Sequence, residues 1–238
     1  NIIYNFKLNS CISNKILRLV LTDPNYFHDV SNDLNDGLIN YWSLDFTLKD
    51  QNTNFYLAGL PLWIDDRFGK ENSSIRILNE SNVLQATTGI YFDSQFTLTL
   101  WYKFDTCSKN MPRLIDFSNP ATNDRIVIFF SDFNCKPRIE IFGEQNCSAE
   151  SEYFQNQKSF PLGTWHHLAI VFNSYHVSFY IDGLWDNKLS TLCSNGKINF
   201  TNCFIGNNLP SGIEIDLDEI KIYNRALSEN EIKRDFKP

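Results

Sequence analysis

Hydrophobic and polar residues alternate most clearly in residues 163–183, and this stretch predicts a β-hairpin. In residues 176–181 the apolar side chains fall on one side and polar or mixed side chains on the other, as in a strand with one buried face. Residues 165–172 are apolar on both sides, which favours a central strand that is covered on both faces. The pair Asp182-Gly183 is typical of a tight turn after the second strand. We therefore expect other strands to lie beside this hairpin.

Short apolar runs separated by turn-rich segments continue along the rest of the chain. Such runs, with few helical patterns between them, indicate an all-β fold of two packed antiparallel sheets, a β-sandwich of the jelly-roll type. The expected strands outside the hairpin are residues 38–45, 74–78, 95–104, 113–117, 125–130, 138–142, 202–206 and 213–223.

One helix is predicted, at the C-terminal end of the chain. Ser228 followed by Glu231 forms a capping-box pattern, and Ile232 and Phe236 then fall on one face of the helix. At the other end, an Asn- and Asp-rich stretch closes at Gly37. We therefore expect residues 1–37 to form a leader or linker segment and residues 38–238 to form the main domain.

Several of these segments together resemble the laminin-G-like (pentraxin/concanavalin-like) jelly-roll domains. The resemblance is carried by Gly163-Thr-Trp-His-His-Leu-Ala-Ile-Val-Phe172, by Phe179-Tyr-Ile-Asp-Gly183 and by residues 215–232, with support from residues 38–45, 68–77 and 96–103. It covers about residues 38–236 and implies two antiparallel sheets, non-catalytic binding and an extracellular position within a larger protein. The cysteine-bearing insert around residues 135–160 and the leader depart from the family pattern.

Charge and cysteine content narrow the functional classes. The 238-residue chain has a formal net charge of −7, which argues against nucleic-acid binding, and it has no apolar run long enough for membrane insertion. Six cysteines without a CxxC pair indicate disulfides and an oxidising, secreted or extracellular location. Fifteen connectivities are open. The preferred pairs are Cys107–Cys135 and Cys193–Cys203, which leaves Cys11–Cys147.

N-glycosylation and calcium binding are two further expectations. Four sequons, no more than chance would give, mark the possible glycan positions Asn72, Asn79, Asn146 and Asn199. Many members of the resembling family bind calcium where the first and last strands meet. At that place Asp45, Asp50 and Asp218 are candidate oxygen ligands.

The segment from Glu214 to Glu219 is the candidate for catalysis. It matches the E-x-D-x-x-E pattern of a group of glycoside hydrolases that share the jelly-roll fold, whose mechanism needs two nearby carboxylates. A change in apolar parity between residues 213–217 and residues 220–222 predicts a β-bulge that turns Glu219 to the face of the other acids. The closing strand of the laminin-G-like family carries a similar Asp-Glu sequence. We therefore expect no enzyme here, and catalysis by Glu214 and Glu219 remains the minor alternative.

The neighbouring residues His166 and His167 face opposite sides of a strand, so we expect structural roles for them, with one ring packed and one exposed, and no shared metal. By analogy with the resembling family, we expect an extracellular binding or adhesion module that recognises a protein partner through an exposed apolar patch. A calcium-dependent lectin that stacks sugars on exposed aromatic residues such as Trp63, Trp185 or Tyr153 is the alternative.

Overall fold

The structure is a computed structural model that describes residues 33–78, 80–106, 112–131, 136–142, 151–155, 160–190, 196–206 and 214–237. The chain divides into two compact units, Asn1–Asp33 and Leu34–Pro238. Apart from Asp33, the first unit lies outside the described residues, so the expected leader over residues 1–37 stays a prediction. The strands, the helix and the candidate sites all belong to the second unit.

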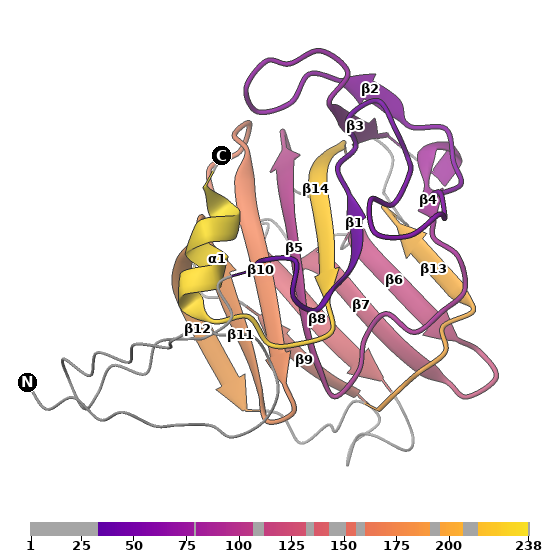
Figure 1. The fold of residues 1–238 in the computed structure, drawn as a ribbon, viewed down its shortest axis with the longest axis vertical. Helices are drawn as coiled ribbons and strands as arrows, with labels where there is room; N and C mark the ends of the chain where they lie inside the picture. Colours follow the sequence, from indigo (N-terminus) through magenta and orange to yellow (C-terminus); the bar gives the residue numbers. More distant parts are fainter. Residues whose placement is uncertain are drawn as a thin grey trace, which may run out of the picture. The chain divides into compact units, whose positions relative to one another are not determined.

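Two antiparallel sheets stack face to face in the second unit, as the sequence predicted (Figure 1). The eight-stranded sheet has the order β12 (Leu184–Ser190), β11 (His176–Ile181), β10 (His166–Asn173), β5 (Gln95–Phe104), β14 (Ile215–Tyr223), β3 (Ser74–Ile77), β2 (Leu62–Ile64), and β1 (Leu38–Trp42) also pairs with β14. The six-stranded sheet has the order β4 (Leu84–Gln85), β13 (Asn202–Ile205), β6 (Arg113–Asn119), β7 (Asp124–Ser131), β8 (Lys136–Phe142), β9 (Ser151–Gln155).

The core fills the space between the sheets with alternate residues of their strands. On β5, for example, Phe96, Leu98 and Leu100 are fully buried against residues of the opposite sheet. The chain passes from the eight-stranded to the six-stranded sheet between β3 and β4, through a 3₁₀ turn at Glu80–Asn82. Successive residues of a strand point to opposite faces of its sheet. In the eight-stranded sheet, the residues that alternate with the core residues therefore form the face that points away from the core. We call it the outer face.

The predicted hairpin is β10 and β11, and β10 is covered on both faces as expected. Its inward side chains join the core, while Ala169 and Val171 on the outer face pack against Leu227 and Ile232. Ile232 belongs to helix α1 (Glu229–Phe236), which lies across this part of the sheet (Figure 1). The predicted capping box is present: Ser228 and Glu231 exchange hydrogen bonds at the start of α1. None of the described helices is long and apolar enough to cross a membrane.

The predicted bulge in the last strand is also present. β14 shifts its register against β5 between Asp218 and Lys221, and Glu219 has a left-handed backbone with φ 51°. The bulge coincides with a change of neighbour. Residues 215–217 of β14 pair with β3, whereas residues 220–223 pair with β1. The side chains of the acidic segment are therefore distributed over two different strand neighbours.

Candidate functional site

The acidic residues of β14 lie on the outer face, and basic side chains bind them. Asp216 is 2 % exposed and accepts two hydrogen bonds from the Arg76 guanidinium, at 2.6 and 3.0 Å. Lys103 Nζ lies 2.8 Å from the same carboxylate, and Arg76 also reaches Glu214 at 3.0 Å. These are charge-assisted contacts of good geometry, so this row of side chains is held as a fixed network.

Asp218 and Glu219 have other partners. Asp218 Oδ2 accepts from Arg67 Nη1 at 2.6 Å. Burial raises the pKa of Asp218 to about 8, with the Glu219 carboxylate adding to the rise and Arg67 opposing it. Glu219 accepts from the Tyr41 hydroxyl at 2.7 Å and lies 3.4 Å from Lys221 Nζ. Glu214 and Glu219 thus contact different basic and hydroxyl groups. These contacts do not indicate that the two carboxylates act together as a catalytic pair.

The carboxylates predicted to bind calcium are each engaged elsewhere. Asp50 is fully buried and accepts hydrogen bonds from the backbone of Tyr41 and Asn52 and from the Thr53 hydroxyl, so it organises the loop after β1. Asp45 is exposed and pairs with Lys70 at 2.5 Å. In the described ranges, no group of three or more His, Cys, Asp or Glu side chains is placed to hold a metal ion. Calcium binding stays a prediction.

Both histidines have structural surroundings, but both are buried, at 9 % and 1 % exposed, whereas the sequence predicted one exposed ring; residues of α1 cover His167 on the outer face. His166 faces the core side, where its Nδ1 lies 2.9 Å from Asp182 and its ring packs near Phe160. His167 lies on the outer face, where Nε2 is 3.2 Å from the Asp235 carboxylate of α1. Burial lowers the pKa of His166, but the hydrogen bond and charge of Asp182 outweigh it and leave this pKa raised.

The structure differs from the expected disulfide pattern at Cys203. This residue has a free thiol, fully buried in the core, where Sγ lies 3.7 Å from the Phe200 carbonyl oxygen. The predicted Cys193–Cys203 bond is therefore not formed, because strand β13 turns this side chain inward. The other five cysteines, Cys11, Cys107, Cys135, Cys147 and Cys193, lie outside the described residues.

Two of the four sequon asparagines can be placed. Asn72 is exposed in the β2–β3 connection, with a left-handed φ of 52°, and Asn199 is exposed just before β13. Asn79 and Asn146 lie outside the described residues. Glycosylation at all four positions stays a prediction.

Exposed apolar side chains gather in one segment. Of the eleven large hydrophobic residues that are exposed in the described part of the chain, six lie between residues 46 and 68. We use the name apolar surface for these six: Phe46, Phe55, Tyr56, Leu60, Leu62 and Phe68. Phe46 packs on Trp63 with ring centroids 5.4 Å apart, so the loop after β1 meets β2 here. The sequence analysis named Trp63 as an exposed aromatic residue, but this side chain is only half-exposed. Its more exposed neighbours were not predicted.

The backbone under this surface is strained. Leu44 and Phe46 both have positive φ angles, 58° and 50°. For a bulky residue this conformation is a genuine outlier, costing on the order of 1–3 kcal/mol. Leu44 is fully buried, but Phe46 is 70 % exposed, so the strain presents an aromatic ring to solvent.

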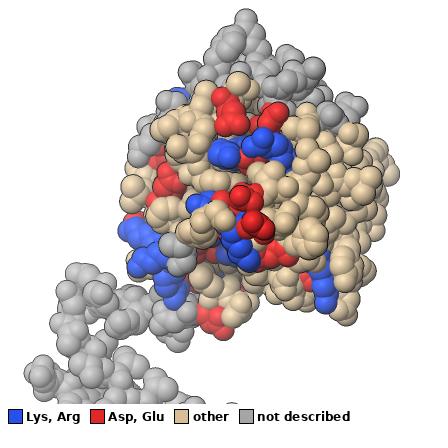
Figure 2. Space-filling model, turned by 90° about the horizontal axis from the view of Figure 1, so that it is seen from above, with Lys and Arg blue, Asp and Glu red and all other residues tan. Residues whose placement is uncertain are grey.

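The charges around the apolar surface are mixed. Seen from the end that carries the β2–β3 connection, acidic and basic side chains lie next to one another (Figure 2). Lys70 is paired with Asp45, and the Arg67 guanidinium lies 4.5 Å from the Phe68 ring and 4.4 Å from the Trp101 ring. Because the basic groups have local partners, this end offers no uniform field to steer a strongly charged ligand.

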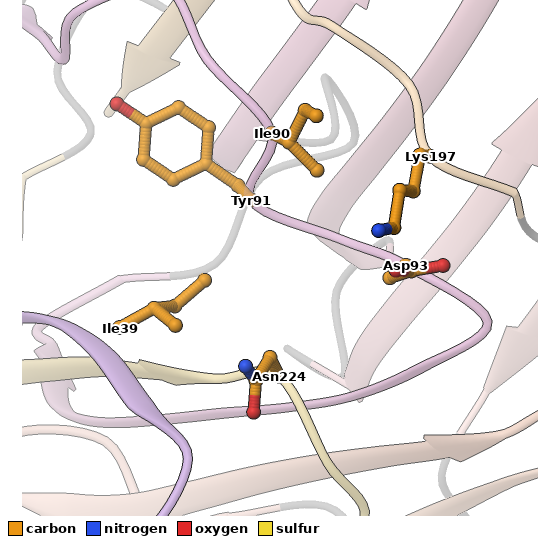
Figure 3. Close-up of a pocket in the computed structure, with 6 residues that line it drawn as sticks. All are labelled: Ile39, Ile90, Tyr91, Asp93, Lys197 and Asn224. Atoms are coloured by element: carbon orange, nitrogen blue, oxygen red, sulfur yellow. The ribbon is translucent and has the colours of Figure 1, made fainter.

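A small pocket of about 190 Å³ lies elsewhere, between segments that lead into the two sheets (Figure 3). It is lined by Ile39 of β1, by Ile90, Tyr91 and Asp93 before β5, by Lys197 before β13 and by Asn224 after β14. None of the carboxylates predicted for calcium or catalysis lines it. No pattern in the sequence indicates this pocket, because its residues come from four separate segments.

The fold is a sandwich of two antiparallel sheets. A sequence model of the concanavalin A-like lectin/glucanases superfamily matches residues 78–233, and the chain belongs to this superfamily. The expected laminin-G-like jelly roll is thus confirmed. No curated protein sequence matches the chain.

Solved structures of similar fold are distant in sequence. The binding domain of Paraclostridial Mosquitocidal Protein 1 matches 86 % of this chain and 52 % of its own length, with 20 % identity and a TM-score of 0.69. Domain 4 of AbnA, a GH43 extracellular arabinanase from Geobacillus stearothermophilus solved with arabinotriose, matches 84 % and 98 %, with 18 % identity and a TM-score of 0.66. The binding domain of botulinum neurotoxin DC, solved with rat synaptotagmin II, matches 86 % and 52 %, with 15 % identity and a TM-score of 0.64. The chain spans about half the length of the two toxin domains, and these similarities show the fold alone.

Proposed function

We propose that this chain is a non-catalytic binding module of a larger secreted or cell-surface protein, and that it recognises a protein partner through the apolar surface. The observation that carries the proposal is the concentration of exposed apolar side chains between residues 46 and 68. Exposed apolar side chains in this number within one segment favour an interaction site, because leaving them in water is unfavourable.

The strained backbone supports the same interpretation. Within the domain the Phe46 ring packs on Trp63, yet the residue stays 70 % exposed, so a partner that covers this ring would offset more of the cost of its left-handed backbone. Aromatic residues are also enriched among the side chains that dominate binding energy at protein interfaces. A neurotoxin binding domain of this fold was solved with the protein synaptotagmin II, so the architecture is compatible with protein recognition.

Carbohydrate binding is the second candidate, since the arabinanase domain of the same fold was solved with arabinotriose. In its calcium-dependent form it would use Asp45, Asp50 and Asp218 as ligands and would require these carboxylates to leave their present partners. Hydrolysis by Glu214 and Glu219 is a weaker candidate, because both are engaged by other side chains. It predicts turnover that is lost in Glu214→Gln or Glu219→Gln.

Binding of the fluorescently labelled chain to a panel of cultured cells tests the proposal. Cells are compared untreated, after trypsin, and after removal of surface glycans, each with calcium and with EDTA. A protein partner predicts saturable binding that trypsin removes and that EDTA and glycan removal leave in place. Binding that resists trypsin, or that EDTA abolishes, would contradict the proposal and favour the lectin.

A further inference from the structure

We propose that the contact between Arg67 and Asp218 positions Phe68 for the protein partner, so that Arg67 and Asp218 are positioning residues of the proposed binding site. The inference rests on the proposed function and deepens it, because it links the acidic segment of β14 to the apolar surface. Asp218 is only 2 % exposed and offers a partner almost no surface. Any effect of Asp218 on binding must therefore act through the side chains that it holds.

Phe68 lies at the tip of the connection between β2 and β3, in a tight turn over residues 66–70. The Asp66 carboxylate accepts hydrogen bonds from the backbone N–H groups of Phe68 and Lys70, at 2.8 and 2.9 Å. Gly69 has a left-handed φ of +79°, which the turn requires. Because these contacts are internal to the turn, they keep its shape but do not fix its position against the sheet. Its position depends on contacts outside the turn.

Lys70 and Arg67 connect this turn to the rest of the domain. Lys70 pairs with Asp45, but both side chains are exposed, and such surface pairs contribute little to stability. Arg67 is the stronger anchor, because its Nη1 donates to the buried Asp218 Oδ2 at 2.6 Å. The guanidinium also lies 4.4 Å from the ring of Trp101, the residue of β5 that pairs with Asp218 across the sheet. Arg67 therefore holds the turn against the outer face.

The hydrogen bonding of this contact is incomplete. Asp218 Oδ1 and Arg67 Nε are both buried, and neither has a hydrogen-bond partner among the described residues. A buried polar pair with such atoms adds little stability, and apolar side chains of similar size often stabilise a fold as well or better. The pair does fix a position, because the guanidinium lies 4.5 Å from the Phe68 ring and links that ring to the outer face. The placing of Phe68 therefore explains the contact better than stability does.

Substitutions at two acids of β14 test this role. Asp218→Leu is close in shape but has no hydrogen-bond acceptor, so Arg67 would be left buried without one and should turn to water. Asp218→Asn keeps an acceptor oxygen and should preserve the contact. Asp216→Leu is the matched control, because Asp216 is equally buried on the same strand and face. The partners of Asp216 are Arg76 and Lys103, which lie outside the turn.

Fluorine NMR of the whole chain with 4-fluorophenylalanine at position 68 reports on the ring without any partner. In the parent we expect a resonance that differs from its value in the urea-unfolded chain, because the folded chain holds the ring beside the Arg67 guanidinium. Asp218→Leu should move the resonance towards the unfolded value, whereas Asp218→Asn and Asp216→Leu should leave it in place. If Asp218→Leu fails to fold, Arg67→Met removes the same hydrogen bond from the other side and should shift the resonance likewise.

Binding to cells with trypsin-sensitive sites measures the consequence for the partner. Asp218→Leu should weaken binding about 5- to 30-fold in Kd, the loss expected when the Phe68 ring no longer contacts the partner. In a chain that already carries Phe68→Ser, Asp218→Leu should weaken binding no further, because the ring that Asp218 positions is absent. Asp216→Leu should bind as the parent does.

Three results would overturn the inference. They are an unchanged fluorine resonance in the Asp218→Leu variant, an equal loss of binding in the Asp216→Leu variant, and an undiminished effect of Asp218→Leu in the Phe68→Ser chain. If the folded parent shows no trypsin-sensitive binding, the proposed function fails and the role toward a partner fails with it, while the fluorine resonance still shows whether Asp218 holds the ring. If the parent binds and the Asp218→Leu variant binds equally well, this inference fails alone.

Discussion

Replacing two exposed rings of the apolar surface should weaken partner binding strongly and folding only slightly. The variant is Phe46→Asn with Phe68→Ser. Phe46 is 70 % and Phe68 is 62 % exposed, so about two-thirds of each ring is left for a partner to cover. Full burial of a Phe side chain is worth about 1.5–3 kcal/mol, which gives about 1–2 kcal/mol for each ring. The pair then accounts for about 2–4 kcal/mol, or about 30- to 1,000-fold in Kd.

The cost to folding is smaller for structural reasons. Phe46 loses its contact with Trp63, and Phe68 loses its contact with the Arg67 guanidinium, each worth on the order of 0.5–1 kcal/mol. Asn is more compatible than Phe with the left-handed backbone at position 46, and this offsets part of the loss. We expect the free energy of unfolding in urea to fall by about 1 kcal/mol.

The matched control is Tyr175→Asn with Trp185→Ser, which removes rings that are 72 % and 53 % exposed elsewhere on the domain. It should bind trypsin-sensitive sites on cells as the parent chain does. Equal binding by the parent and the Phe46→Asn, Phe68→Ser variant would refute the reasoning. An equal loss of binding in the control variant would also refute it, because any exposed ring would then contribute to binding.

The remaining predictions concern the fold around these sites. Because the pKa of His166 is raised in the folded chain, its contribution to stability is present below about pH 6.5 and is lost as the pH rises through the folded value; His166→Gln should flatten this part of the urea-stability profile. Gly206→Ala should cost about 2 kcal/mol or more, since a Cβ there would lie 2.2 Å from Ile77 Cδ1 at a φ of +76°. Gly69→Ala, with a φ of +79° and open space around it, should cost only the backbone strain of about 1 kcal/mol. Calorimetry that finds an equal loss of stability in the Gly206→Ala and Gly69→Ala variants would contradict the clash at Gly206. Finally, Cys203 should react with a thiol reagent only after unfolding, because burial raises its pKa to about 12; peptide mapping that finds it in a disulfide would disprove the free thiol.

Local patterns in the sequence predicted much of the sandwich. The hairpin of β10 and β11 followed from alternation, and the bulge at Glu219 followed from the change in apolar parity along β14. These features depend on residues within a few positions of one another. Strand β12 was missed because Leu184 and Trp185 are both exposed while Asp186 and Asn187 are both buried, so no period of two is visible.

The site could not be predicted from the sequence to the same degree, because its contacts are long-range. Arg67 and Arg76, which bind the acids of β14, stand 151 and 140 positions before Asp218 and Asp216. In the sequence alone, the acidic residues suggest a catalytic site. In the folded chain, the arginines lie beside them and the acids form an ion-pair network. The sequence predicted an exposed apolar patch but not its position. Residues 46–68 form mostly irregular backbone, in which exposed residues have no regular spacing.

Photo-crosslinking from the apolar surface tests the central claim most directly. A benzophenone analogue of phenylalanine replaces Phe68 in one protein and Tyr175 in the other, and both are irradiated on cells that bind the chain. We predict one saturable covalent adduct to a protein from position 68, competed by unlabelled parent chain and not by the Phe46→Asn, Phe68→Ser variant. Position 175 should give none. Adducts of equal yield from both positions, or adducts only to glycolipid from position 68, would contradict the proposed protein recognition.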